Sequence, residues 1–124
     1  VYIKGQVPVE QLPQIISKAD IGVVNYTISQ YTDEVVSVKL FEYVILGIPV
    51  ISVRTKGTET YFDNSAVSFF VSGDEDNLVD CIVDLYRRPQ KRQELAENAQ
   101  KVLLTHNGQR YRRDYYELID DLCP

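Results

Sequence analysis

The chain has 124 residues, of which 44% are hydrophobic and 25% are charged, and its net charge is −5. This length supports one compact domain, and the composition is that of a soluble, globular protein. The acidic balance argues against nucleic acid as a partner, and the apolar stretches are too short to span a bilayer.

The first part of the chain alternates short apolar runs with a helical pattern. Val1–Lys4 is predicted to be a strand, and Pro8–Lys18 a helix with one apolar face. Ile21–Asn25 is a continuous apolar run, which is typical of a parallel strand buried on both faces. Tyr26–Val36 is polar and rich in tyrosine, so we expect a loop there.

A second helix and strand follow this loop. Ser37 is a suitable N-cap for a helix over Val38–Leu46, and Gly47 is expected to end that helix. Ile48–Val53 is predicted to be a second buried strand. The next segment is a connection, with a helical turn expected at Thr58–Phe62.

The last part of the chain is predicted to hold one more strand and three helices. The strand is Val67–Val71. Each helix has apolar residues at helical spacing. They are Leu78, Cys81, Ile82, Leu85 and Tyr86 in the first, which Pro89 ends; Leu95, Ala99, Val102 and Leu103 in the second; and Tyr111, Tyr115, Leu118, Ile119 and Leu122 in the third. Strands that alternate with helices predict an α/β fold with a mainly parallel sheet.

Two charged side chains stand alone in the apolar stretch 35–53: Lys39 and Glu42. One interpretation is an ion pair between them, since residues three apart share a helix face. The other is a cleft in which they meet a polar ligand. A carboxylate can accept two hydrogen bonds from the paired hydroxyls of a ribose. The free N–H groups of residues 38–40, with the helix dipole, suit a diphosphate at the carboxyl end of the sheet.

Several stretches resemble one family in both order and spacing: VYIKGQV, LPQIISKADIGVVNY, SVKLFEYVILGIPVISVRTKGTETYF, FFVSGDEDNLVDCIVDLYRRPQKRQELAENA and RYRRDYYELIDDL. The chain is similar to the C-terminal domain of the family-four (group 1) retaining glycosyltransferases of the GT-B fold. The K-L-x-E-Y-x-x-x-G-x-P-V core is the most specific of these motifs.

The resemblance implies roles for particular residues. Glu42 would bind the ribose hydroxyls of the donor, and Glu34, eight positions earlier, would touch the donor sugar as the catalytic residue. The alternative for Glu34 is a solvated loop charge. The remaining donor-binding residues would be Lys39 beside the phosphates, the backbone of Val36, Ser37 and Val38 along the phosphates, and Gly5, Gln6 and Val7 at the base. The alternative for Gly5 is a glycine that only ends a strand.

The implied fold is a partial Rossmann-like parallel sheet of about four strands with helices on both faces and a helical C-terminus. Residues 1–124 would be a single, incomplete domain that binds the donor, a nucleotide diphosphate sugar, without metal or another cofactor. The parent enzyme would transfer the sugar to an acceptor glycan or lipid-linked sugar held by an absent N-terminal domain. Polysaccharide or surface glycan assembly in the cytoplasm, or at the inner face of the membrane, is the expected setting.

Two further expectations concern the isolated chain. It is expected to be inactive alone, and its exposed strand edges favour a homo-oligomer. The alternative function is a binding or assembly module that keeps the fold without the donor site. This alternative is favoured by Val35, Val36 and Ser37, which stand where family members usually have glycines. Another GT-B enzyme, such as a nucleotide-sugar epimerase, fits the K-L-x-E-Y core less well.

Other polar residues are weaker candidates for a site. Arg54 follows a predicted strand and could reach a phosphate, but a surface ion pair is the simpler interpretation. Cys81 and Cys123 have no metal-type spacing, so free thiols are expected. His106 is the one histidine of the chain and stands near a predicted helix end, where a cation is favoured.

Overall fold

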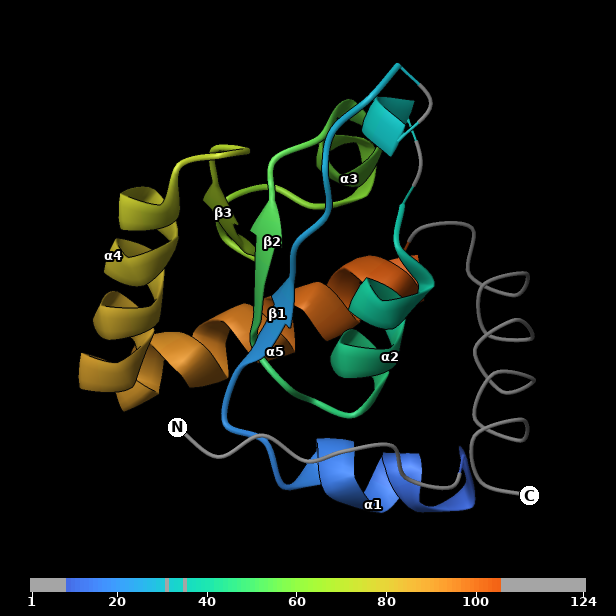
Figure 1. Cartoon of the computed structure of the whole chain (residues 1–124). Helices are drawn as coiled ribbons and strands as arrows, with labels where there is room; N and C mark the ends of the chain where they lie inside the picture. The colour runs from blue at the N-terminus through green and yellow to red at the C-terminus, as the bar shows by residue number, and fades with distance from the viewer. Residues whose placement is uncertain (1–8, 31, 35, 106–124) are drawn as a thin grey trace.

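A parallel sheet lies at the centre of the molecule (Figure 1). The computed structural model describes residues 9–30, 32–34 and 36–105. Within these ranges the strands β1 (Gly22–Val24), β2 (Val50–Val53) and β3 (Ser68–Phe70) lie in the order β1-β2-β3, and both pairs are parallel. The predicted parallel α/β sheet is therefore confirmed. The strand expected at Val1–Lys4 lies outside the described residues.

Helices and short 3₁₀ turns connect the strands. They are η1 (Val9–Gln11), α1 (Leu12–Ser17), η2 (Thr32–Glu34), α2 (Val38–Ile45), α3 (Lys56–Tyr61), α4 (Glu75–Arg87) and α5 (Pro89–Thr105). None of the helices in the described ranges has the length and apolar character needed to cross a membrane. The third predicted C-terminal helix lies outside the described residues, as do His106 and Cys123.

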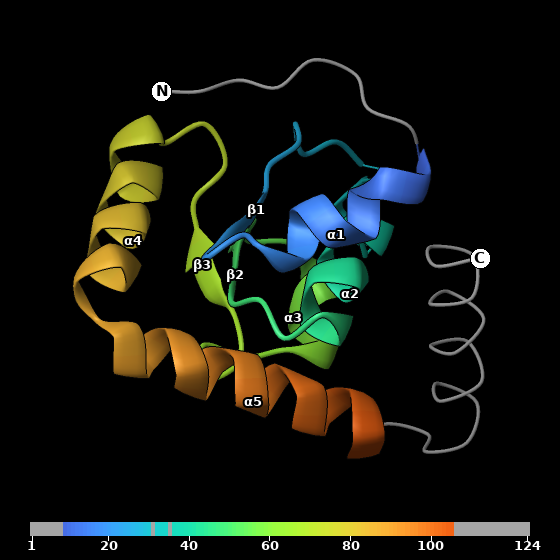
Figure 2. The ribbon, with the colours of Figure 1, turned by 90° about the horizontal axis from the view of Figure 1, so that it is seen from below.

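Helices cover both faces of the sheet, as expected (Figure 2). Successive side chains of the strands point to opposite sides, so each face has its own group of buried side chains. We call the two groups of buried side chains the α2-side cluster and the α4-side cluster. Both are listed here by their main members. The first contains Val24, Leu40, Val44, Val50, Phe69, Ala99 and Leu103. The second contains Ile51, Val53, Phe70, Leu85 and Leu95. The strand β2 contributes side chains to both clusters.

The burial of β1 differs from the prediction. Val23 is 36% exposed, whereas the apolar run around it predicts a strand buried on both faces. The reason is the position of β1 at one end of the described sheet, since α4 packs on β2 and β3 instead. The apolar stripe predicted on α4 is also partly wrong, because Ile82 and Tyr86 are 38% and 77% exposed.

The helix α2 begins and ends close to the predicted positions. Ser37 occupies the N-cap in an extended conformation, but its side chain makes no capping hydrogen bond. Gly47 follows the last turn with a φ of +75°, a left-handed conformation that costs glycine little. The amide of Gly47 donates to the carbonyl of Val44, and that of Ile48 donates to Tyr43. The glycine therefore ends the helix, as predicted.

Candidate functional site

The segment between β1 and α2 leaves the carboxyl end of the sheet, where open α/β proteins bind their ligands. Its polar side chains form hydrogen bonds within the segment. The hydroxyl of Thr32 accepts a hydrogen bond from the amide of Ser29 at 2.6 Å and donates to the carbonyl of Thr27 at 3.0 Å. The loop expected over 26–36 is thus confirmed in outline for the described residues 26–30, 32–34 and 36, with the short 3₁₀ turn η2 as an addition.

Lys39 and Glu42 lie one turn apart on α2. Lys39 is exposed and Glu42 is half-buried. The ion pair that their spacing allows is not formed, and neither side chain bonds to another residue in the described part of the chain. Glu42 thus offers a carboxylate that the described protein groups leave without a partner. This geometry favours a ligand over an internal ion pair.

The first turn of α2 differs from the expectation in one respect. The amide of Leu40 donates to the carbonyl of Ser37 at 3.1 Å, so it is not free for a diphosphate. The amides of Val38 and Lys39 have no backbone partner among the described residues. The side chain of Val38 is 60% exposed, whereas Val36 and Ser37 are half-buried.

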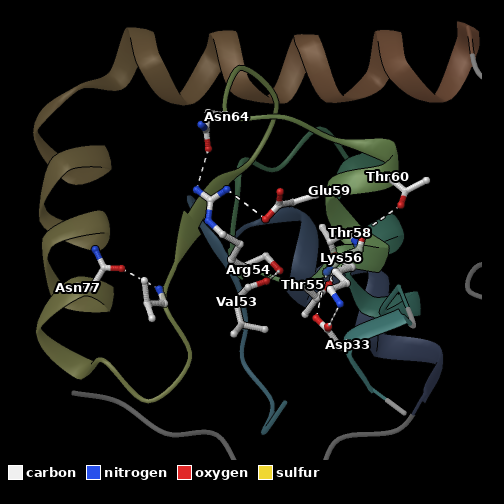
Figure 3. A network of polar contacts seen from close by, with 12 residues as sticks. Asp33, Val53, Arg54, Thr55, Lys56, Thr58, Glu59, Thr60, Asn64 and Asn77 are labelled. Atoms are coloured by element: carbon white, nitrogen blue, oxygen red, sulfur yellow. Dashed lines mark hydrogen bonds and ion pairs between the residues drawn. The ribbon is translucent and has the colours of Figure 1, made fainter. Parts of the chain in front are cut away.

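Glu34 ends η2 and is exposed. The preceding residue, Asp33, contacts the start of α3: its Oδ1 accepts from the amide of Lys56 at 3.1 Å, and Oδ2 lies 3.7 Å from Lys56 Nζ (Figure 3). Asp33 is not among the site residues predicted from the sequence. The three residues expected at the base, Gly5, Gln6 and Val7, lie outside the described residues.

Arg54 follows β2 and is engaged by protein groups. Its guanidinium donates to Glu59 Oε1 at 3.2 Å and to Asn64 Oδ1 at 3.1 Å (Figure 3). The same group lies 4.8 Å from the centre of the Phe69 ring. The surface ion pair that the sequence favours for Arg54 is confirmed.

A cavity of about 400 Å³ lies at the carboxyl edge of the sheet, between the segment after β1 and the start of α4. Its lining combines polar groups with apolar ones: Asn25, Tyr26, Thr27, Phe70, Ser72, Gly73, Asp74, Glu75 and Leu78. None of the predicted site residues that the structure describes lines it. The sequence Ser72-Gly73-Asp74 could have indicated the part of the lining that lies at the start of α4, because it is typical of a turn followed by a helix N-cap. Asp74 does cap α4, by accepting a hydrogen bond from the amide of Asn77.

Comparisons with known proteins agree with this architecture. Among solved structures, the crystal structure of Anabaena Alr3699/HepE in complex with UDP has a similar fold, with a TM-score of 0.61 and 16% sequence identity. The match covers 89% of this chain and 30% of the HepE chain, so it shows the fold of part of a GT-B glycosyltransferase. No curated protein matched the chain. A family model described as glycosyl transferase-like matches residues 1–117, and the chain therefore belongs to the glycosyl transferase-like family.

Proposed function

We propose that this chain binds the nucleotide diphosphate of an activated sugar, as the donor-binding part of a glycosyltransferase. The observation that carries the proposal is Glu42, a half-buried carboxylate on α2 without a partner among the described residues. Its helix follows β1 at the carboxyl edge of the sheet, where an anion can meet a helix N-terminus. Family membership and the likeness to HepE, which was crystallised with UDP, support the same interpretation.

Each predicted residue has a defined part in this proposal. Glu42 accepts hydrogen bonds from both ribose hydroxyls. The amides at the start of α2, together with Lys39, meet the diphosphate. Glu34 meets the donor sugar. Removing the partner of a charged hydrogen bond costs about 1.5–3 kcal/mol, or about 10- to 100-fold in affinity.

Calorimetric titration of the chain with UDP and GDP tests the proposal. The wild type is expected to bind one of them, and Glu42→Gln is expected to bind it about 10- to 100-fold more weakly. The matched control is Glu94→Gln, an exposed carboxylate on α5 that should leave the affinity unchanged. A 2′,3′-dideoxy nucleotide should lose more affinity for the wild type than for Glu42→Gln, because the ionised carboxylate is the stronger acceptor for the ribose hydroxyls.

The outcomes separate the two function classes. Binding that is identical in the wild type and Glu42→Gln contradicts the ribose role. No binding of either nucleotide to the wild type favours the alternative, a binding or assembly module without a donor site. We further propose that sugar transfer, with retention and without metal, requires parts of an enzyme beyond this chain. The isolated chain should therefore release no sugar from UDP-glucose or GDP-mannose.

The proposed partners are the donor, an acceptor glycan and a second copy of the chain. Support for the second copy comes from β1, which has a neighbouring strand on one side only within the described sheet. Unpaired strand edges invite pairing with another chain. Light scattering at high protein concentration should give twice the monomer mass. A monomer at every concentration would contradict this part of the proposal.

A further inference from the structure

The side chain of Asp33 joins two segments that are 23 residues apart in the sequence. Its Oδ1 accepts the amide hydrogen of Lys56, the first residue of α3, at 3.1 Å (Figure 3). Its other oxygen lies 3.7 Å from Lys56 Nζ. A carboxylate at this position is favourable because the N-terminus of a helix carries partial positive charge.

The helix that receives this contact is firmly attached to the core. Thr55 caps α3 by accepting from the amide of Thr58 at 3.1 Å, and the two hydroxyls are 2.9 Å apart. Both threonines are fully buried. At the other end of α3, the rings of Tyr61 and Phe62 lie 6.2 Å and 6.0 Å from that of Phe41 on α2. The anchor point of Asp33 is therefore fixed relative to both β2 and α2.

The turn that carries Asp33 is also held from its other side. The amide of Asp33 donates to the carbonyl of Ser29 at 3.0 Å, and Thr32 bonds to the same residue. Glu34 follows directly, is exposed, and has no partner in the described part of the chain. Bonds on both sides thus fix the backbone that presents the Glu34 carboxylate.

We infer that Asp33 is a positioning residue: by holding η2 against α3, it places the Glu34 carboxylate where the donor sugar lies. This inference rests on the proposed function, in which Glu34 touches that sugar. If the Glu34 carboxylate moves by about 1 Å, its contact with the sugar can be lost. Removing the bond between Asp33 and α3 should therefore weaken sugar binding by more than the energy of that bond alone.

The two contacts of Asp33 can be separated by substitution. Asp33→Ala removes both of them. Asp33→Asn keeps an oxygen that accepts from the Lys56 amide, and Lys56→Met removes only the ion pair. That pair contributes little, because the Lys56 side chain is 83% exposed. The backbone hydrogen bond is therefore the contact that should matter.

The experiment measures the sugar increment, defined as the affinity for a nucleotide sugar divided by the affinity for the nucleotide alone. Calorimetry with UDP against UDP-glucose and UDP-galactose, and GDP against GDP-mannose, gives this ratio for each variant. The increment should fall about tenfold in Asp33→Ala and in Glu34→Gln, with nucleotide affinity unchanged. Asp33→Asn and Lys56→Met should retain it. Amide exchange of Lys56 should become faster in Asp33→Ala alone.

Each result has one interpretation. An increment that is unchanged in Asp33→Ala, or that Asp33→Asn fails to retain, overturns the positioning role while leaving nucleotide binding intact. The positioning role is also overturned if Asp33→Ala weakens binding of the nucleotide and of the sugar nucleotide by the same factor. The substitution would then affect the whole nucleotide site and not the sugar contact. Failure of the wild type to bind any of these ligands rejects the proposed function and the inference together. If Asp33→Ala does not fold, Asp33→Leu replaces it, because leucine also lacks the acceptor oxygens and is similar to aspartate in length.

Discussion

The ring of Tyr43 on α2 lies over the α carbon of Gly22 on β1, so that a methyl group there would be 2.5 Å from Cδ2 and 2.6 Å from Cγ. These distances are shorter than any van der Waals contact, and the ring would have to move. Gly22→Ala is expected to lower the free energy of unfolding by about 1–3 kcal/mol, as overpacked sites do. Urea denaturation measures this change.

The Tyr43→Ala background is the control for this prediction. Without the ring, Gly22→Ala should cost clearly less, because the two residues are in contact and their effects are coupled. Gly73→Ala differs from Gly22→Ala because a methyl group at Gly73 would have no atom within 4 Å. Only the backbone φ of +79° at Gly73 makes that substitution unfavourable. Additive effects of Gly22→Ala and Tyr43→Ala would contradict the predicted clash.

Lys39 should contribute to nucleotide affinity through charge alone. Lys39→Met is expected to weaken UDP or GDP binding about fivefold at low salt, because an exposed charge pair is worth up to about 1 kcal/mol. The loss should shrink at 0.5 M salt, since ions screen exposed charges. The control is Lys101→Met, an exposed lysine on α5. An equal loss in both variants would indicate a general charge effect instead of a contact at α2.

Thr55 should be the most sensitive cap in the described chain. Thr55→Val keeps the shape of the side chain but leaves the buried amide and hydroxyl of Thr58 without their partner. The expected loss in unfolding free energy is about 2–3 kcal/mol. Asp74→Ala removes the exposed cap of α4 and should cost about 1 kcal/mol. Chemical denaturation of both variants gives the comparison, and equal losses would argue against the role of burial.

Asp84 predicts a pH dependence, because it joins α4 to α5. Lys91 donates to its Oδ2 at 2.5 Å, and Arg88 lies 3.2 Å from its Oδ1. The hydrogen bond from Lys91 lowers the pKa of Asp84 from 3.8, with Arg88 contributing further. A carboxyl whose folded pKa is below its unfolded value stabilises the fold above the unfolded pKa. That stabilisation is lost as the pH falls through the folded pKa.

Asp84→Asn should therefore lower the free energy of unfolding by about 0.5–1 kcal/mol at pH 7, the size expected of a partly exposed pair. The difference from the wild type should shrink as the pH falls below 3.8 and vanish at lower pH. Denaturation curves across pH 2–7 measure both effects. Asp80→Asn, an exposed change on the same helix, is the control. A difference that does not shrink as the pH falls would mean that the pair is not its cause.

The elements that sequence predicts well are those with local signals. The helix over 38–45 has apolar residues at helical spacing, and Gly47 ends it through a conformation that glycine adopts readily. Residues 50–53 are apolar except for Ser52, and the structure buries all of them. These features depend on residues that are close in the sequence, so the amino-acid sequence alone predicts them.

The features that sequence misses depend on distant partners. The exposure of Val23 follows from which strands and helices lie beside β1, and an apolar run carries no information about that. The bond from Asp33 to Lys56 spans 23 residues, and neither residue has a distinctive motif. The cavity beside Asn25 and Gly73 likewise requires two loops to meet at one edge of the sheet. The roles of Glu34 and Glu42 stay predictions.

The strand β2 contributes Val50 to the α2-side cluster and Ile51 and Val53 to the α4-side cluster. Both halves of the core therefore pack on the same strand. Opening of either half exposes side chains of that strand. Native-state hydrogen exchange should therefore report one cooperative unit, in which the amides of all three strands exchange with the same free energy as global unfolding.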